Sequence, residues 1–184
     1  SCEVEFASEF RYRKLILDKY TAVIALSQSG ETADTLAAIR EAKRQGALVL
    51  GIVNTVGSTL ARETHGGNYN HAGQEVSVAS TKAFTSQLGV LALLTLFLGR
   101  KRGLSLSDGK KIARALQELP KLMEQVLADG KNMKKWAKKF AGKKNFLFLG
   151  RKYNFPIAFE GALKIKEIAY VSAEGYATGE MKHG

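Results

Sequence analysis

The sequence predicts an α/β fold with a parallel sheet. Two apolar runs, residues 22–26 and 48–54, have the length of strands, and the second is nearly continuous, as in a strand covered on both faces. Between them, residues 33–44 are rich in Ala and Leu and have the composition of a helix. A strand, a helix and a second strand at this spacing are typical of a βαβ unit, whose two strands lie parallel in one sheet.

The segments around this unit complete the first half of the chain. Residues 2–6 alternate polar and apolar side chains, which predicts a strand leading into residues 7–14. Gly46 is a stop signal for the 33–44 helix, and residues 57–59 begin a short helix. Residues 65–73 are rich in Gly and Asn, so we expect a loop that contains a short strand.

The most informative stretch is Ser27-Gln28-Ser29-Gly30-Glu31-Thr32, where the first apolar run meets its helix. The first N–H groups of a helix have no internal partner, and the helix dipole is positive there. Gly30 allows close approach of the backbone, and the Ser and Thr hydroxyls add donors. Together these features favour a bound anion, and a phosphate monoester fits best. The alternative is a Ser/Thr-rich turn that only caps the helix.

A long helix is predicted from Thr81 to about Arg100, with Ser80 as its cap. Residues 88–98 are almost wholly apolar, so a membrane span is one interpretation. However, the apolar part is shorter than the roughly 18–20 residues that a bilayer requires. We therefore expect no membrane association and a helix buried between the layers of an α/β domain.

Two further helices and a second apolar run follow. Residues 109–128 carry apolar side chains at helical spacing with Pro120 as a potential kink, and residues 131–140 are amphipathic. Residues 146–150 then open what resembles a new α/β domain. Pro156 suits the first turn of a helix that continues to about Tyr170. We expect the chain to be a piece of a longer protein.

Three ionisable residues of this last helix fall on one stripe. Glu160, Lys164 and Glu167 are spaced i, i+4 and i+7. An ammonium beside a carboxylate favours the charged form, so Lys164 would keep Glu167 ionised and ready to accept a proton. The alternative is an exposed ion pair on a helix surface. His183 lies in a Gly-punctuated segment, and by itself a lone His near a chain end is incidental.

Composition excludes several classes of protein. The formal net charge is +11, but much of the excess lies in seven Lys of residues 131–144, a stretch without Arg. Such a run indicates a solvated helix and linker rather than a nucleic-acid groove, which mixes Arg with aromatics. One Cys excludes an internal disulfide and a zinc cluster and fits a reducing compartment, so we expect a cytoplasmic protein. The three His lack metal-ligand spacing.

Read together, these stretches resemble the isomerase (SIS) region of the glucosamine-6-phosphate synthases, which are glutamine–fructose-6-phosphate aminotransferases (isomerizing). The resemblance spans essentially the whole chain, and five motifs in order are specific to this family and its close relatives. The matching motifs are CEVE from Cys2 with SEFRYR from Ser8, SQSGETADTL from Ser27, VASTKAFTSQL from Val78, FLGR from Phe148, and EGALKIKEIAY with AEGYATGEMKHG from Glu160 onward.

The resemblance implies a flavodoxin-like SIS fold, a parallel sheet with helices on both faces. It places a first SIS domain at residues 1–104 without its N-terminal strand and helix, a helical connector at 105–140, and the truncated start of a second SIS domain at 141–184. It also implies site residues. Those that match substrate-binding positions are Ser27, Gln28, Ser29, Thr32, Val78 and Ser80. Those that match catalytic positions are Glu167, Lys164 and His183.

The implied reaction adds ammonia to open-chain fructose 6-phosphate and isomerises the imine to glucosamine 6-phosphate. Glu167 would move the proton between C1 and C2, with Lys164 beside it. His183 would open the sugar ring and be contributed across a homodimer. The resemblance implies no metal or cofactor and a glutaminase domain upstream. Cys2 is not the glutaminase nucleophile. Because the family's C-terminal lysine is also missing, the 184-residue chain alone should bind phosphosugar weakly and not complete turnover.

Three other interpretations remain open. A non-catalytic phosphosugar-sensing SIS module would keep the Ser27 loop without needing the Lys164–Glu167 pair or the Lys-His-Gly end. A related SIS isomerase or deglycase would share most of the motifs. The net charge is the only feature that suggests a basic nucleic-acid-binding protein. The affinity of such a protein for nucleic acid would fall steeply as the salt concentration rises.

Overall fold

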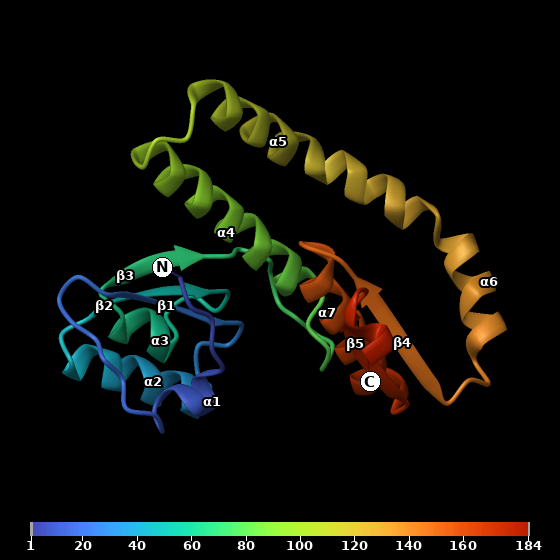
Figure 1. The fold of residues 1–184 in the computed structure, drawn as a ribbon, viewed down its shortest axis with the longest axis horizontal. Helices are drawn as coiled ribbons and strands as arrows, with labels where there is room; N and C mark the ends of the chain where they lie inside the picture. Colours follow the sequence, from blue (N-terminus) through green and yellow to red (C-terminus); the bar gives the residue numbers. More distant parts are fainter. Residues whose placement is uncertain (1, 184) are drawn as a thin grey trace. The chain divides into compact units, whose positions relative to one another are not determined.

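The computed structural model describes residues 2–183, which form two compact units (Figure 1). The first comprises the chain up to Val76 together with Ser80–Ala113, and the second comprises Ser77–Ala79 and the chain from Arg114 onward. Each unit contains its own parallel sheet. The domain limits expected from the sequence stay a prediction.

The first unit is built on three parallel strands in the order β1-β2-β3, and the βαβ unit predicted from the sequence supplies the first two. β1 (Ala22–Ser27) pairs with β2 (Leu48–Val53), and β2 pairs with β3 (Gly66–Tyr69). α2 (Ala33–Arg44) connects β1 to β2, and α3 (Thr59–Glu63) connects β2 to β3. β3 is the short strand expected within the Gly-rich segment. Because the strands are parallel, their C-terminal ends, and the loops that follow them, lie at one edge of the sheet.

The core of this unit lies between α2 and one face of the sheet. Ile39 and Ala42 of α2 pack in one cluster with Val49 and Val53 of β2 and Leu60 of α3, all of them buried. α2 ends where predicted, because Gly46 takes φ +88° and its N–H bonds to Lys43 O at 2.9 Å. Ala47 N bonds to Ala42 O at 3.1 Å. These two bonds satisfy the last carbonyls of the helix.

The opposite face of the sheet is less covered than the sequence predicts. In the register of β1 and β2, Ala22 lies beside Leu48 and Ile24 beside Leu50. Some side chains on this face remain accessible, with Leu26 43% and Leu48 46% exposed, although Ile52 is buried. Parallel sheets normally carry cover on both faces. The two-sided burial expected of β2 is therefore realised toward its C-terminal end, where Ile52 on this face and Val53 on the other are both buried, but not at Leu48.

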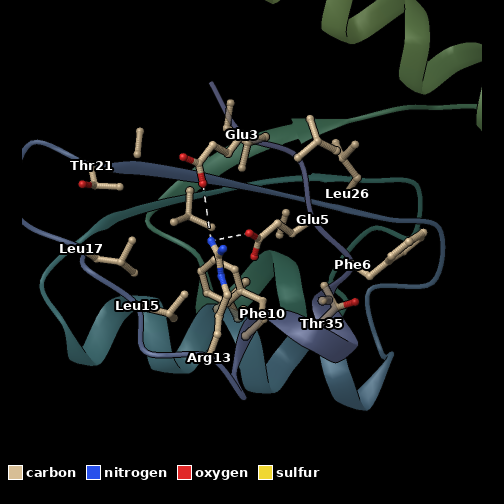
Figure 2. Close-up of a pocket in the computed structure, with 18 of the residues that line it drawn as sticks. Glu3, Glu5, Phe6, Phe10, Arg13, Leu15, Leu17, Thr21, Leu26 and Thr35 are labelled. Atoms are coloured by element: carbon tan, nitrogen blue, oxygen red, sulfur yellow. Dashed lines mark ion pairs between the residues drawn. The ribbon is translucent and has the colours of Figure 1, made fainter. Parts of the chain in front are cut away.

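The strand predicted for residues 2–6 is wrong. The segment joins no sheet, and it leads into α1 (Ala7–Phe10), a single helical turn. Its backbone is extended at Phe6 (φ −73°, ψ 133°), but a cavity of about 780 Å³ separates the segment from β1 (Figure 2). In Figure 2, Arg13 points toward Glu3 and Glu5 and forms ion pairs with both. Alternation alone cannot make a strand where no neighbouring strand is in hydrogen-bonding reach.

Three long helices follow β3: α4 (Lys82–Lys101), α5 (Leu106–Ala128) and α6 (Gly130–Phe140). The burial expected for α4 is wrong for the described residues, since Ala83 is its one buried residue and Leu93 and Phe97 are more than half exposed. By length and mean hydropathy (1.4) α4 could cross a membrane, a test that core helices of soluble proteins also pass. α5 continues through Pro120.

The second unit pairs β4 (Asn145–Gly150) in parallel with β5 (Ser172–Ala177). α7 (Asn154–Ala169) connects them, with Pro156 in its first turn as predicted. α7 packs on both strands through buried Ala158 and Ala162. β5 lies in a Gly-containing stretch to which the sequence analysis assigns no strand. A short 3₁₀ helix, η1 (Glu180–His183), follows β5.

Candidate functional site

The loop that joins β1 to α2 is held in shape by its own hydroxyl groups. Ser27 is buried at the end of β1, and its Oγ accepts a hydrogen bond from Gly30 N at 2.9 Å. Ser29 Oγ accepts from Glu31 N at 3.2 Å. Each hydroxyl uses an acceptor position in these contacts and keeps its own proton to donate. Two hydroxyl donors thus remain for a ligand at this turn.

The start of α2 is open to a ligand. Thr32 occupies the N-cap position, and within residues 2–183 its side chain makes no capping hydrogen bond. The hydroxyl is exposed. The first N–H groups of α2 therefore keep their capacity to bind an anion, with the positive end of the helix dipole behind them. This arrangement argues against the interpretation of the turn as a simple helix cap.

Gly30 is required by the geometry of the loop. It takes φ +69°, and a Cβ at this position would lie 2.2 Å from Ser58 Oγ. Its carbonyl accepts from Leu60 N at 2.9 Å. Next to it, Glu31 Oε1 accepts from the backbone N–H of Thr59 at 2.7 Å, and this hydrogen bond lowers the pKa of Glu31 below its ordinary value. The loop is thus braced against the N-terminus of α3 before any ligand binds.

Gln28 presents an unused acceptor. Its backbone carbonyl accepts from Asn54 N at 3.3 Å and Thr55 N at 3.2 Å, which ties the loop to the end of β2. Its side-chain Oε1 is buried and has no hydrogen-bond partner among the described residues. Buried polar atoms are rarely left without a partner. A ligand hydroxyl or another donor at this place would satisfy it.

Two more predicted substrate-binding residues lie between β3 and α4. Val78 is 98% exposed. Ser80 is half-buried, and its Oγ lies 3.5 Å from Glu75 Oε2, to which it donates. Both positions precede the N-terminus of α4. The predicted contacts of these residues with a sugar stay a prediction.

The predicted stripe on α7 is present as a three-residue ion cluster. Lys164 Nζ lies 2.7 Å from Glu167 Oε2 and 3.2 Å from Glu160 Oε1. The three side chains are between 22% and 32% exposed. Glu167 Oε2 contacts the ammonium as an ion pair without the alignment of a hydrogen bond, so this oxygen keeps acceptor capacity. Two carboxylates share one ammonium, which leaves the cluster one negative charge in excess.

Lys164 stays protonated in this cluster. Burial by itself lowers the pKa of Lys164, but the adjacent carboxylates of Glu167 and Glu160 outweigh it, and the net pKa is raised. The ammonium therefore cannot take up a proton at neutral pH. It can donate hydrogen bonds and offset negative charge beside Glu167, which leaves a carboxylate as the proton acceptor of the cluster.

His183 and its surroundings form the last predicted part. The imidazole is exposed on η1, which packs against β5. On β5, Tyr176 donates its hydroxyl to Glu174 Oε2 at 2.6 Å, which raises the pKa of Tyr176. The sequence analysis did not identify this pair. Among residues 2–183, no group of three or more His, Cys, Asp and Glu side chains is arranged to hold a metal ion.

The structure thus brings the predicted residues together in two separate groups. Ser27, Gln28, Ser29 and Thr32 form one, in the first unit, and Lys164 and Glu167 form the other, in the second. Sequence reasoning missed Asn54 and Glu75, whose side chains hold the segment before α4. No standard motif spacing marks either residue, because their partners lie five to nineteen residues away.

Known proteins resemble the whole chain closely. A glutamine–fructose-6-phosphate aminotransferase [isomerizing] from Bacteroides thetaiotaomicron is 51% identical over 183 residues, and one from Chlorobaculum tepidum is 54% identical over 182 residues. Each alignment covers 99% of this chain and 30% of the relative. The chain therefore spans about a third of the length of these curated relatives.

Solved structures share the fold. The C-terminal domain of glucosamine-fructose-6-phosphate aminotransferase from Francisella tularensis superimposes with a TM-score of 0.95 at 42% identity, covering 100% of this chain and 52% of that chain. A glucosamine-6-phosphate deaminase from Thermotoga maritima aligns with a TM-score of 0.66 at 22% identity, over 97% of this chain and 52% of the other. At that identity the second likeness concerns the fold alone.

The family itself follows from a direct match. The family model described as the SIS domain matches residues 1–97, which is more than half of the chain. The α/β fold with a parallel sheet agrees with this match. The chain therefore belongs to the SIS domain family.

Proposed function

We propose that this chain is the phosphosugar-isomerising part of a glutamine–fructose-6-phosphate aminotransferase. In that role it binds fructose 6-phosphate and converts it, with ammonia, to glucosamine 6-phosphate. The observation that carries the proposal is the β1–α2 loop, where free hydroxyl donors face the uncapped first turn of α2. The relatives that match 99% of the chain at 51% and 54% identity support the choice of substrate.

The phosphate group is held at the start of α2 in this proposal. Ser27, Ser29 and Thr32 donate their hydroxyls, and the first N–H groups of the helix add charge complementarity. The buried Oε1 of Gln28 accepts a hydrogen bond from a hydroxyl of the sugar phosphate or from a neighbouring donor. Val78 and Ser80 contact the sugar chain.

The chemistry begins with the open-chain ketone. His183 promotes ring opening by proton transfer, ammonia adds to C2, and water leaves to form the C2 imine. Glu167 then removes a proton from C1 while the imine nitrogen takes up a proton from solvent, which gives an enolamine with a double bond between C1 and C2. The same carboxylic acid returns its proton to C2, while the C1 hydroxyl releases its proton to solvent and becomes the aldehyde, so that no net proton is gained or lost. Lys164 offsets the charge that shifts during this transfer.

The proton transfer is redox-neutral, so the proposal needs no redox cofactor, and it includes no metal ion. We place a glutaminase domain upstream in the full protein as the source of ammonia, since the relatives are about three times longer than this chain. We further propose a cytoplasmic homodimer in which His183 serves the site of the partner subunit. No nucleic acid and no membrane take part.

The test uses the full-length protein that contains this chain. With saturating ammonia, wild type should convert fructose 6-phosphate to glucosamine 6-phosphate. Glu167→Gln should keep its phosphosugar affinity, while turnover falls by about 10²–10⁴-fold because an acid–base group is lost. Calorimetry measures the affinity, and detection of the amino sugar measures the rate.

The matched control is Glu118→Gln, an exposed carboxylate on α5, which should behave as wild type. Turnover by Glu167→Gln within a few-fold of wild type would contradict the role given to this carboxylate. Phosphosugar binding without any turnover in wild type would favour a sensing module over an enzyme. Robust product formation by the isolated 184-residue chain would refute the expectation that it cannot complete the reaction.

A further inference from the structure

The segment between β3 and α4 has no regular structure, but its path is fixed by Asn54. This residue follows β2 directly. Its Nδ2 donates to Gly73 O at 2.7 Å, and its Oδ1 accepts from Ala72 N at 2.8 Å. Its backbone N–H donates to Gln28 O at 3.3 Å. One residue therefore connects the backbone of residues 72–73 to the β1–α2 loop.

Glu75 fixes the next part of the segment. Its Oε2 accepts from Ala83 N at 3.0 Å and from Thr81 N at 3.2 Å, and its Oε1 accepts from Thr81 Oγ1 at 3.1 Å. Oε2 also receives the hydroxyl of Ser80 at 3.5 Å. Thr81 occupies the N-cap position of α4 without a capping bond from its own side chain. Glu75 thus supplies the cap of α4 from six residues upstream.

The charge of Glu75 suits this role. The N–H of Ala83 lowers the pKa of Glu75, burial opposes the shift, and the N–H and hydroxyl of Thr81 and the ammonium charge of Lys82 lower it further. The carboxylate is therefore ionised at neutral pH, where it also faces the positive end of the α4 dipole. Residues 76–80 form a short loop that is closed at its base by charge-assisted hydrogen bonds.

Two loops that the proposed function assigns to the substrate are thereby joined. From Gln28 the contacts run through Asn54 to residues 72–73, and from there the chain leads within two residues to Glu75, which holds Ser80. All of these residues lie in the first unit. The path consists of hydrogen bonds between 2.7 and 3.5 Å and a short stretch of chain, so the two loops are connected without a gap.

We propose that Asn54 and Glu75 are positioning residues that hold Ser80 at a fixed place relative to the β1–α2 loop, so that one sugar phosphate meets both. This inference rests on the proposed function. Neither residue needs to touch the substrate. Through its hydrogen bonds, Asn54 holds the backbone of residues 72–73 near Gln28. Glu75 holds Ser80 in place at the start of α4.

The inference predicts a particular kinetic pattern. Inorganic phosphate should bind only at the β1–α2 loop. The hydrogen bonds that hold this loop do not involve Glu75 and remain when Glu75 is changed. Fructose 6-phosphate also needs the sugar contact at Ser80. Loss of Glu75 should therefore raise the KM for fructose 6-phosphate and leave inhibition by inorganic phosphate unchanged. An overall loosening of the fold would move both quantities together.

The experiment compares four forms of the full-length protein at saturating ammonia: wild type, Glu75→Ala, Glu75→Gln and Gln74→Ala. Gln74 is the exposed neighbour and serves as the matched control. Glu75→Ala should raise KM about 10-fold and lower kcat less than about 3-fold. Glu75→Gln keeps an oxygen acceptor and should stay within about 3-fold of wild type in KM. Gln74→Ala should match wild type.

Inorganic phosphate provides the second readout. Its inhibition constant should change less than about 2-fold in every variant. Should Glu75→Ala prove insoluble, Asn54→Ala and Thr81→Val remove other links of the same path and should each raise KM with the phosphate constant unchanged. An unchanged KM in these variants would overturn the inference, as would an equal rise in KM and in the phosphate constant. Wild type without activity on fructose 6-phosphate would instead defeat the proposed function.

Discussion

The two candidate groups of this chain are built on different principles. The β1–α2 loop is shaped by backbone: Gly30 takes a conformation that a side chain would block, and the loop carbonyls bond to α3 and to the end of β2. The α7 cluster is shaped by side chains: Glu160, Lys164 and Glu167 lie on one face of an ordinary helix and hold one another by charge. The loop offers donors at fixed positions, while the cluster offers a charge that can accept a proton.

This difference suggests how substitutions in each group would impair its function. A backbone-built anion site tolerates the loss of one hydroxyl but not a change of backbone path. A side-chain cluster keeps its helix when one member is replaced but loses its charge balance. Changes in the loop should therefore act on folding and affinity together, whereas changes in the cluster should act on the rate.

The largest effect is expected for Gly30→Ala. The new Cβ would lie 2.2 Å from Ser58 Oγ in a backbone at φ +69°. We expect the free energy of unfolding to fall by about 2–4 kcal/mol and phosphosugar affinity to fall at least about 100-fold. Denaturant unfolding and calorimetry with fructose 6-phosphate on the full-length protein measure the two quantities.

Gly57→Ala is the matched control for this change. Gly57 has a similar φ of +71°, but a Cβ there would meet nothing within 4 Å. The control should cost about 1 kcal/mol of stability from backbone strain alone and leave affinity unchanged. If Gly30→Ala bound the phosphosugar as well as Gly57→Ala does, the loop would not be the anion site.

An intermediate effect is expected for Lys164→Met, which removes the ammonium between two carboxylates. Turnover should fall about 10–100-fold with little change in KM, and stability should fall by about 1 kcal/mol. Because the folded-state pKa of Lys164 is raised, its stabilising contribution is present at neutral pH and is lost as the pH rises through the folded-state pKa.

The stability difference between wild type and Lys164→Met should thus hold steady across neutral pH and, on the alkaline side, shrink above pH 10 or so, near the ordinary lysine value. Urea unfolding at several pH values measures it. Lys166→Met, an exposed lysine on the same helix, is the control. A difference that changed steeply within the neutral range, where the ammonium and both carboxylates are charged, would mean that another group sets the balance of the cluster.

The smallest effect is expected for Arg40→Ala. Its guanidinium makes two hydrogen bonds to Glu63, at 2.7 and 2.6 Å, on an exposed surface that links α2 to α3. Solvent-exposed pairs contribute little, so the denaturation midpoint should shift only slightly, and less in high salt. Calorimetry should find phosphosugar affinity within about 2-fold. A 10-fold loss would show that the α2–α3 link shapes the loop.

Much of the fold could be predicted from sequence because its signals are local. The apolar runs of β1, β2 and β4, the stop at Gly46 and the placement of Pro156 each depend on neighbouring residues, and the structure confirms them. The hydroxyl-rich turn between β1 and α2 was also recognisable, since it follows a strand and precedes a helix. The binding and catalytic roles of its residues stay a prediction.

The rest depended on distant partners. Residues 2–6 have strand-like alternation but no strand beside them to bond, whereas Ser172–Ala177 contains Gly and Glu and still forms β5, because α7 returns it to the side of β4. The apolar length of α4 predicted burial that the described residues do not provide. Glu75 caps α4 from outside any capping motif, so only the three-dimensional contacts reveal it.

The outer edge of β1 has a practical consequence. No strand pairs with that edge among residues 2–183, and the apolar Ile24 and Leu26 on this strand are 36% and 43% exposed. Such an edge is a template for uncontrolled strand addition between molecules. Recombinant work on the 184-residue chain alone should therefore meet precipitation that grows with protein concentration, and a lysine introduced at position 24 should keep samples clear for longer.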